Sequence, residues 1–502
     1  MVFRTRNTHL PPGPSGLPVL GNVFDIPHQK QWEWFYGQSK KYGSDVNLYT
    51  VFGTKIIVLN SREAIEALFE KELERYSSKA PRKMADISNL TMTLPFMDPG
   101  DVFSHARKQF HLGIGPTAVG QYAGACEAAS AAFVRALAAD EGCTKLTQTI
   151  DHSLGALFLR VSTGYDGART GEALDKMNAL AHFAADVLAD KYRCFDIPPL
   201  NKVVSWVPGW VPWLGKQVKL GREWKTQLHA TAAMTVDLTK EGTAAGHPSV
   251  MAQEGIDAPG ADEQSKMIAA TMNAGGMLAS ESATVTFLLA MAQHPEIMRR
   301  AQAEVDGVCA GRLPTLTDRK QLPFLDAVFC EVLRWVSIAP VISREVMEDD
   351  HYNGHLIPKG AQIMANSWAI SRDESEYPEP EKFLPDRFLD ATGTALRTDI
   401  LHPMKYAFGY GHRTCPGRFL ADALLFSHFA HILAVFDVQL PLKTQGAKLD
   451  ADGAIKLKSN GAAVRIEEVY VTLSPRATTV AAAALAPKDA PAQNGHANGV
   501  AH

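Results

Sequence analysis

The sequence has few cysteines and almost no excess of charge, and both shortages exclude classes of protein. Six cysteines among 502 residues are too few and too scattered for a disulfide framework. A reducing compartment fits better, with one cysteine available for chemistry. Fifty basic against fifty-four acidic residues give a net charge of −4, so nothing in the charge favours nucleic acid. The composition, 46% hydrophobic and 21% charged, also excludes general disorder, a collagen-like fibre and a coiled coil.

A membrane-spanning segment is also missing from the sequence. The residues before the rigid proline run at 11–18 include two arginines and a histidine, so they form neither a signal peptide nor a span, which needs about 20 apolar residues. The longest apolar stretch later in the chain, Phe419 to Phe436, carries an aspartate and two histidines. This stretch therefore predicts a buried helix.

The middle of the chain shows no internal repeat and no strong linker, which favours a single large domain. Two short strands are predicted at Val46–Val51 and Lys55–Leu59, with Gly53-Thr54 as their turn. Asn60 is then predicted to cap a helix that runs through Phe69.

Helical periodicity dominates from about residue 120 to residue 340. Extended segments follow at 352–366, then a proline-rich stretch at 373–415, and then one long helix. The order predicts a mainly α-helical fold with a small β region (α+β).

The two ends differ in composition from this body. We divide the chain into an N-terminal segment with the proline-rich hinge (1–18), a main domain (19–473) and a tail (474–502). The tail is rich in Ala, Asn and Gly and cannot bury a core, so it is predicted to be disordered, with room for one short helix over Val480–Leu485.

One cysteine has a recognisable chemical setting. Phe408, Gly411, Arg413, Cys415 and Gly417 match the pattern F-x-x-G-x-R-x-C-x-G. At residue frequencies of a few per cent each, chance supplies this pattern in roughly one chain in ten thousand. A thiolate is stabilised by backbone N–H groups at a helix start, and Gly411 and Gly417 allow a flat cofactor to approach closely.

This segment resembles the haem-binding loop of a cytochrome P-450 of the fungal secondary-metabolism type. The likeness extends from the proline run to about residue 470. It implies the cytochrome P-450 fold and haem b (iron protoporphyrin IX), with Cys415 as the axial iron ligand, whose thiolate donation favours O–O cleavage. Phe408, Arg413 and Gly417 are then expected to contact the haem.

Further motifs support the resemblance. Glu331 and Arg334 form the family's E-x-x-R pair, and Arg387 in a following Phe-Leu-Pro-Asp-Arg-Phe segment completes its structural Glu-Arg-Arg triad. Arg344 stands where the family places a basic residue against a haem propionate. Arg107 is expected to reach a propionate as well, although the tryptophan that usually precedes it is replaced by Phe103.

The central helix departs from the family pattern. Counting back from His294-Pro295-Glu296, the acid of A-G-x-D-T has become Leu278 and the alcohol Ala279. Neither side chain can donate a proton to iron-bound dioxygen. We expect Ser282, Glu281, a substrate hydroxyl or ordered water to take over this role, unless Ser282 and Glu281 only pack the helix, or the chain no longer activates oxygen.

The expected lid over the haem is rich in tryptophan. Residues 195–224 hold four of the eight tryptophans, with prolines at 198, 199, 208 and 212, and they either pack the lid or contact a membrane surface. The loop before Arg107 is apolar and is expected to line a pocket for a lipophilic substrate; its members are Met84, Ile87, Leu90, Met92, Leu94, Phe96 and Met97.

No flavin- or nucleotide-binding half follows Leu473, so the resemblance implies a separate NADPH–cytochrome P-450 reductase as electron donor. Its docking face is expected to use Arg299, Arg300, Lys405, His412 and Arg418. The family sits on the cytoplasmic face of the endoplasmic reticulum membrane, so we expect a peripheral attachment or a truncated sequence. We expect a monomer.

Together these features predict a haem-thiolate monooxygenase that inserts one oxygen atom of O2 into a lipophilic small molecule, for example a terpenoid in secondary-metabolite biosynthesis. The replaced acid–alcohol pair keeps a first alternative open, a haem enzyme that uses peroxide or acts as an isomerase or dehydratase. A second alternative is a non-catalytic haem or ligand carrier.

Overall fold

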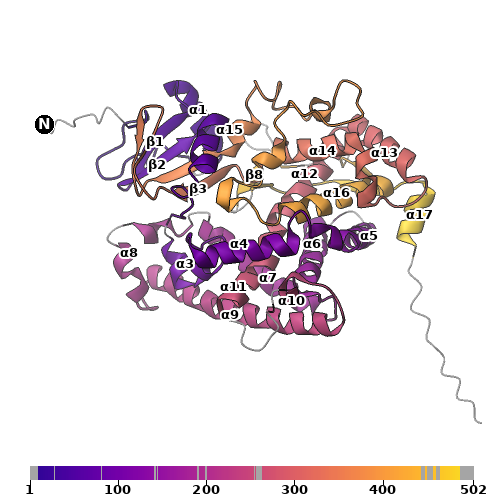
Figure 1. The fold of residues 1–502 in the computed structure, drawn as a ribbon, viewed down its shortest axis with the longest axis horizontal. Helices are drawn as coiled ribbons and strands as arrows, with labels where there is room; N and C mark the ends of the chain where they lie inside the picture. The colour runs from indigo at the N-terminus through magenta and orange to yellow at the C-terminus, as the bar shows by residue number, and fades with distance from the viewer. Residues whose placement is uncertain are drawn as a thin grey trace, which may run out of the picture.

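The computed structural model describes residues 10–486, except 28, 81, 141, 142, 144, 189, 190, 198, 199, 254, 256–262, 442–446, 449–455 and 460–463. In that part of the chain the fold is mainly helical, with one four-stranded sheet and three strand pairs. Figure 1 shows the sheet at the upper left and a broad helical layer across the lower half. The predicted fold class is therefore confirmed.

The helices account for most of the described residues. Those of ten or more residues are α1 (Gln31–Tyr42), α4 (Asp101–Ile114), α5 (Ala123–Ala139), α6 (Leu146–Thr163), α7 (Thr170–Leu188), α9 (Leu214–Ala244), α11 (Glu263–Gly275), α12 (Met277–Gln293), α13 (Pro295–Cys309), α14 (Pro323–Trp335) and α16 (Arg418–Val435). The shorter ones are α2 (Arg62–Ile65), α3 (Lys83–Ile87), α8 (Leu200–Val203), α10 (Val250–Gln253), α15 (Ser367–Ser371) and α17 (Thr479–Leu485), together with the π-helical turn η1 (Glu66–Lys71).

The four-stranded sheet joins segments from both ends of the chain. Its order is β1 (Val46–Val51), β2 (Thr54–Leu59), β6 (Gln362–Asn366) and β3 (Val341–Glu345). β2 is antiparallel to β1 and parallel to β6. The strand pairs are β7 (Phe436–Gln439) with β10 (Thr472–Pro475), β4 (Asp350–Tyr352) with β5 (His355–Ile357), and β8 (Leu457–Ser459) with β9 (Val464–Ile466).

The predicted first strand pair is confirmed, but the predicted helix cap after it is wrong. Ser61, not Asn60, caps α2, because its hydroxyl accepts a hydrogen bond from the Ala64 N–H at 3.1 Å. Asn60 instead joins buried amides across the sheet, accepting from Asn366 at 2.8 Å. After one turn α2 continues as η1.

The centre of the molecule is built around α12. Its residues from Met277 to Ala292 are buried, with the single exception of Ala279. The break between α11 and α12 falls at Gly276, where a Cβ atom would lie 2.6 Å from the Phe158 ring. A glycine is required there because the two helices cross α6 so closely.

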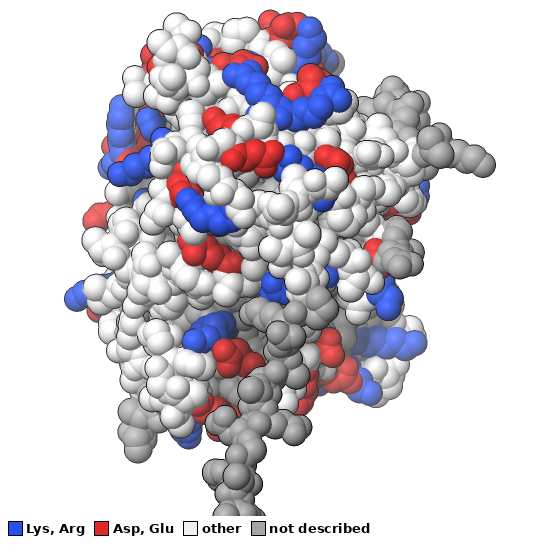
Figure 2. Space-filling model, turned by 90° about the vertical axis from the view of Figure 1, so that its right-hand side faces the viewer, with Lys and Arg blue, Asp and Glu red and all other residues white. Residues whose placement is uncertain are grey.

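Two helical stretches, Ser265–Gln293 and Arg418–Val435, have the length and composition to cross a membrane. In the structure, 82% and 72% of the most apolar 18-residue segment of each stretch is buried inside the protein. Core helices have this character, as the sequence predicted for the second stretch. On the face that carries α13 and α17, acidic and basic side chains alternate (Figure 2), in keeping with the small net charge of −4.

The predicted beginning of a disordered tail at 474 differs from the structure. β10 continues to Pro475, and α17 follows with Ala481 and Ala484 buried against α5 and α16. Because alanine is small, α17 can pack closely against both α5 and α16. The alanine-rich run therefore forms a helix that packs on the core, although its composition predicted disorder. Residues 487–502 lie outside the described residues.

Candidate active site

The loop that carries Cys415 is held in shape by its own backbone. The Cys415 N–H donates to the Phe408 carbonyl at 2.7 Å, and Gly409 and Gly411 both have positive φ, 79° and 54°. The helix expected to start at the cysteine begins at Arg418, with Gly417 as its N-cap residue. Cys415 therefore precedes the first turn of α16 instead of lying in it.

The side chain of Cys415 is accessible, although enough protein surrounds it for burial to raise the pKa of its thiol. The Gly417 N–H and the charges of Arg107 and Arg418 act in the other direction and favour the thiolate.

The two glycines expected to admit a flat cofactor have different roles. A Cβ atom on Gly411 would lie 2.3 Å from the Phe69 carbonyl oxygen, so this glycine admits the backbone of η1. Gly417 is the one beside the sulfur, because its Cβ would lie 3.9 Å from the Cys415 sulfur. Of the two glycines, only Gly417 therefore lies beside the thiol.

A second accessible spot lies on the central helix. Gly275 and Ala279, one helical turn apart, are exposed, whereas the α12 residues after Ala279 are buried. The position where the family carries its alcohol therefore faces an open space, and Leu278 packs on Ala181 and Ala185 of α7. The alignment of the family's A-G-x-D-T motif with Gly275–Ala279 is consistent with the exposure of these two residues.

Three basic residues that the sequence singled out converge near the loop. Arg107 on α4 donates to the Thr414 carbonyl, and Arg413 donates to the carbonyls of Ser77 and Met97 at 2.7 and 2.6 Å. Arg344 on β3 is buried. Burial, together with the charges of Arg413 and Arg107, lowers its pKa to about 9.

Lys79 is a fourth cation in this group, and sequence reasoning missed it. Burial lowers its pKa far below the usual range, and the charges of Arg344, Arg413 and Arg82 add to the effect. Neither Lys79 nor Arg107, Arg344 or Arg413 forms an ion pair with a carboxylate in the described part of the chain. No local motif marks Lys79, because only the folded chain brings it to the other cations.

The expected structural triad is assembled. Glu331 and Arg334 on α14 are fully buried and joined by two bonds of 2.7 Å, and the Arg387 guanidinium lies 3.3 Å from Glu331. Both arginines also donate to backbone carbonyls between residues 371 and 382. The triad therefore ties the irregular segment before the Cys415 loop to α14.

The structure gives the two expected proton carriers other partners. The Ser282 hydroxyl donates to the Val464 carbonyl on β9 at 2.6 Å. Glu281 lies 3.0 Å from Arg465 on the same strand. At about 100° per residue, Glu281 projects roughly 200° around the helix from Ala279, so the two residues face opposite sides.

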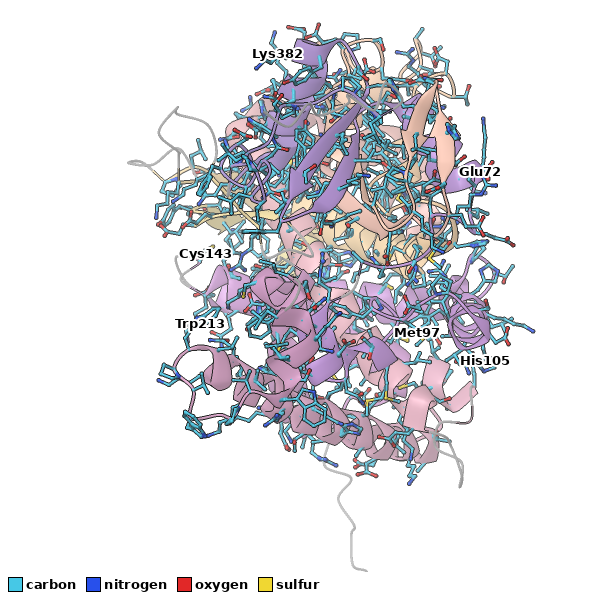
Figure 3. The ribbon with its side chains drawn as sticks, turned by 90° about the vertical axis from the view of Figure 1, so that its left-hand side faces the viewer. Glu72, Met97, His105, Cys143, Trp213 and Lys382 are labelled. Carbon is cyan, nitrogen blue, oxygen red and sulfur yellow. The ribbon has the colours of Figure 1, made fainter. Side chains whose placement is uncertain are left out.

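The expected lid separates into an exposed and a packed part. Trp206, Trp210 and Trp213 are 83%, 82% and 58% exposed, whereas Trp224 stacks on Phe183 with ring centres 4.6 Å apart. Figure 3 shows Trp213 at the left-hand side of the molecule, whereas Met97 and His105, from α4 and its preceding loop, lie at the right. The prolines at 198 and 199 lie outside the described residues.

The expected pocket-lining loop is apolar and largely buried. Two of its members, Met84 and Ile87, pack against Gly221 of α9, where a Cβ would meet them at 2.8 and 2.7 Å. Leu94 and Met97 lie nearer the cations, since their carbonyls accept from Arg413. The loop is thus divided between α9 and the interior space.

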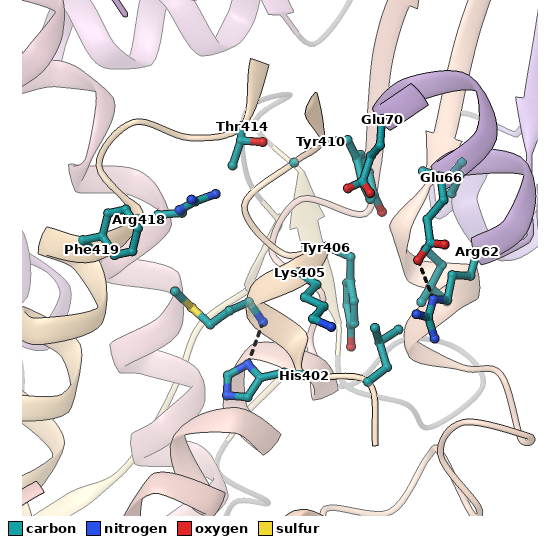
Figure 4. Close-up of a pocket in the computed structure, with 15 residues that line it drawn as sticks. Arg62, Glu66, Glu70, His402, Lys405, Tyr406, Tyr410, Thr414, Arg418 and Phe419 are labelled. Atoms are coloured by element: carbon teal, nitrogen blue, oxygen red, sulfur yellow. Dashed lines mark hydrogen bonds and ion pairs between the residues drawn. The ribbon is translucent and has the colours of Figure 1, made fainter. Parts of the chain in front are cut away.

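A separate cavity of about 670 Å³ lies beside the Cys415 loop. Figure 4 shows Arg418 and Lys405 on one side of it and Glu66, Glu70 and Arg62 on the other. Of the expected docking cations, Lys405 and Arg418 line this cavity, His412 and Arg299 are exposed, and Arg300 is already paired with Asp386 at 2.7 Å.

Comparison with known proteins decides the family. The model of the family described as Cytochrome P450 matches residues 11–464. The chain belongs to the cytochrome P450 family. It is 33% identical to cytochrome P450 monooxygenase COX2 of Coprinopsis cinerea, over 88% of this chain and 85% of that protein. It is 32% identical to tryptamine 4-monooxygenase of Psilocybe cyanescens, over 89% and 90%, and 33% identical to cytochrome P450 monooxygenase claR of Ampulloclitocybe clavipes, over 89% and 83%.

As a member of this family the chain is an oxidoreductase that uses haem b, O2, a small-molecule substrate and a reductase partner. The residues present fit the cofactor. An accessible thiol, a helix face opened at Ala279, and four cations without carboxylate partners suit a flat group with an axial ligand site and two propionates. Arg344 is buried and the other three basic residues are partly buried, so anionic groups beside them would be favourable.

Proposed function

We propose that this cytochrome P450 inserts one oxygen atom of O2 into a lipophilic small molecule of secondary metabolism, with Cys415 as the iron ligand. The observation that carries the proposal is the accessible Cys415 thiol near four basic residues that form no carboxylate ion pair in the described part of the chain. When bound, thiolate-ligated haem supplies the oxygen chemistry, and the protein supplies binding, orientation and electrostatics.

In this proposal the cations bind the propionates. Arg344, Arg107 and Arg413 are joined by Lys79, and each gains a direct ion pair, which for Arg413 adds to the more distant charge of Asp98. Phe408 and Gly417 border the ring at the loop, and the Gly417 N–H holds the sulfur in its charged form. The Glu331 triad acts at a distance, because it fixes the segment that leads into the loop.

The substrate is apolar in this proposal because the loop before α4 presents Leu, Met and Phe side chains. A terpenoid-like compound has that character. Of the three relatives compared, only one has a substrate in its name, and that substrate is tryptamine. The apolar lining therefore carries the substrate class here.

Proton delivery is assigned to ordered water or a substrate hydroxyl. Ser282 already donates its proton to Val464, and Glu281 faces away from Ala279. The exposed face at Gly275 and Ala279 leaves room where the family's alcohol would stand. A water or a substrate group in that space replaces the missing Asp–Thr pair.

The electron donor is proposed to be an NADPH–cytochrome P-450 reductase that docks over the cavity beside the Cys415 loop. Lys405 and Arg418 offer positive charge there, His412 is exposed nearby in the Cys415 loop, and Arg300 is excluded by its pair with Asp386. The exposed tryptophans at 206, 210 and 213 are proposed to touch the cytoplasmic face of the endoplasmic reticulum membrane.

Replacing the ligand tests the assignment. Cys415→Ser is expected to abolish the reduced, carbon-monoxide absorption band of a thiolate-ligated haem, because serine does not supply a thiolate. Cys330→Ser, on a buried thiol of α14 that contacts His402 at 3.2 Å, is the control and should keep the band. A band that survives Cys415→Ser would refute the assignment.

One observation favours a second candidate function. Leu278 and Ala279 replace the acid–alcohol pair and cannot donate protons to bound oxygen. The second candidate is therefore a haem enzyme that uses peroxide, or one that isomerises or dehydrates its substrate. Turnover with NADPH and reductase is compared with turnover on added peroxide alone. Product formed only with peroxide would favour this candidate over the monooxygenase.

A further inference from the structure

A buried phenol close to the cation cluster has the setting of a redox-active tyrosine. Tyr76 is 3% exposed, and its hydroxyl donates to the Asp350 carboxylate at 2.7 Å. Asp350 on β4 is nearer the surface and also pairs with Arg75 at 3.2 Å. Tyr76 thus combines a sheltered ring with a base that can take its proton.

The ring of Phe69 links this tyrosine to the haem site. Its centre lies 6.2 Å from that of Tyr76 and 6.0 Å from that of Tyr410, which belongs to the Cys415 loop. The Arg344 guanidinium lies 5.8 Å from the same ring. Directly after Tyr76, the Ser77 carbonyl accepts from Arg413. Both cations are proposed propionate ligands, so Tyr76 lies beside the residues that would hold the haem.

Other buried tyrosines lack this combination. The Tyr377 hydroxyl donates to the Leu401 carbonyl at 2.5 Å, and a carbonyl cannot take up a proton. The Tyr410 hydroxyl is bonded to Ser367 at 2.9 Å. Loss of an electron makes a phenol strongly acidic, so a carboxylate in a direct hydrogen bond makes its one-electron oxidation far easier.

We propose that Tyr76 is a one-electron redox site that protects the enzyme. When an oxidising equivalent at the haem is not used on substrate, the Tyr76 phenol gives it one electron and passes its O–H proton to Asp350. The O–H bond breaks, a neutral tyrosyl radical remains, and the carboxylate becomes a carboxylic acid. A soluble reductant such as ascorbate then returns one electron, the Asp350 proton returns to oxygen, and the phenol is restored.

This inference rests on the proposed haem site and adds an activity to it. The test treats substrate-free holoenzyme with hydrogen peroxide, freezes it rapidly and records the electron paramagnetic resonance spectrum. Wild type and Tyr377→Phe, the matched loss of a buried phenol, are expected to show a tyrosyl radical. Tyr76→Phe is expected to lose the signal and to bleach its haem faster under peroxide.

Asp350→Asn gives a second reading that keeps both rings in place. Its amide accepts the hydrogen bond but cannot take the proton, so the radical yield should fall. A radical that persists unchanged in Tyr76→Phe, or is absent from wild type with a normal carbon-monoxide band, would overturn the inference and leave the monooxygenase assignment standing. Absence of the carbon-monoxide band itself would instead remove the haem site and this inference together.

Discussion

Ser282 is the residue whose role decides whether α12 itself delivers protons to bound oxygen. Its hydroxyl lies on the same side of α12 as Ala279 but donates to the Val464 carbonyl. Ser282→Ala is therefore expected to cost about 1–3 kcal/mol of stability, because it leaves a buried carbonyl unpaired. Product formed per NADPH consumed should not change. A marked fall in this yield would instead make Ser282 part of the proton relay.

Asp151, on α6, shows how burial changes a carboxyl group. Burial and the charge of Glu281, opposed by Arg465, raise its pKa to about 7. One oxygen of each carboxylate is buried without a hydrogen-bond partner in the described protein. One guanidinium thus serves two acids, and the pair holds a proton near neutral pH.

This arrangement predicts a pH dependence of stability. Unfolded Asp151 has a pKa of about 3.9, so the folded state holds its proton more tightly between about pH 4 and pH 7. Stability is therefore lost as the pH rises through that window. Asp151→Asn removes the loss, so its thermal midpoint relative to wild type should be higher at about pH 8 than at about pH 4.

Asp175→Asn, on the exposed side of α7, is the control for this prediction, and its midpoint should follow wild type at both pH values. A difference between Asp151→Asn and wild type that does not change with pH would contradict the prediction. It would show that Asp151 has an ordinary acidity in the folded protein.

The sequence predicted the residues that stand in local motifs and missed those that do not. Cys415, Arg413 and Gly417 belong to one short pattern, and Glu331 and Arg334 share one helix face, so the resemblance to the family could assign them from the sequence. Lys79 and Asp151 have no such neighbours. Their roles come from segments far apart in the chain, and only the fold brings these together.

At the scale of elements, α17 shows how an alanine-rich run acquires a place in the fold. A helix of seven residues is unstable alone, so packing must hold it. Thr478 caps it by accepting from the Ala481 N–H at 3.1 Å, and Arg476 anchors the preceding turn on Asp306 at 2.6 Å. Composition predicted disorder because it counts residue types and not the surface they meet.

The packed face of α17 can be tested directly. Ala481→Glu places a charge in the contact with α5 and α16, and the helix should detach because docking is its main support. Protease cleavage between residues 477 and 486 should then become faster. Ala482→Glu adds the same charge on the exposed side and should cleave at the wild-type rate. Equal rates for both variants would mean that α17 is not docked in solution.

At the scale of the whole molecule, the exposed tryptophans distinguish one region from the rest. Trp206, Trp210 and Trp213 follow α8 and precede α9, and Figure 1 places α8 at one end of the molecule. Three large rings are costly to leave in water, whereas the face in Figure 2 carries mixed charges. The sequence predicted this cluster, but only the fold separates it from Trp224, which is partly buried and stacks on Phe183.

The cluster predicts binding to lipid through apolar contact. If about 80 Å² of each ring leaves water, the gain is about 2 kcal/mol per tryptophan. The holoenzyme should therefore float with neutral phosphatidylcholine vesicles, and added salt should not release it, because no charge pairing is involved. The variant with Trp206→Ser, Trp210→Ser and Trp213→Ser should stay in solution. Val102→Ser with Leu112→Ser removes two exposed apolar side chains of α4 and should float like wild type. If the triple variant floats as well, these rings do not form the contact.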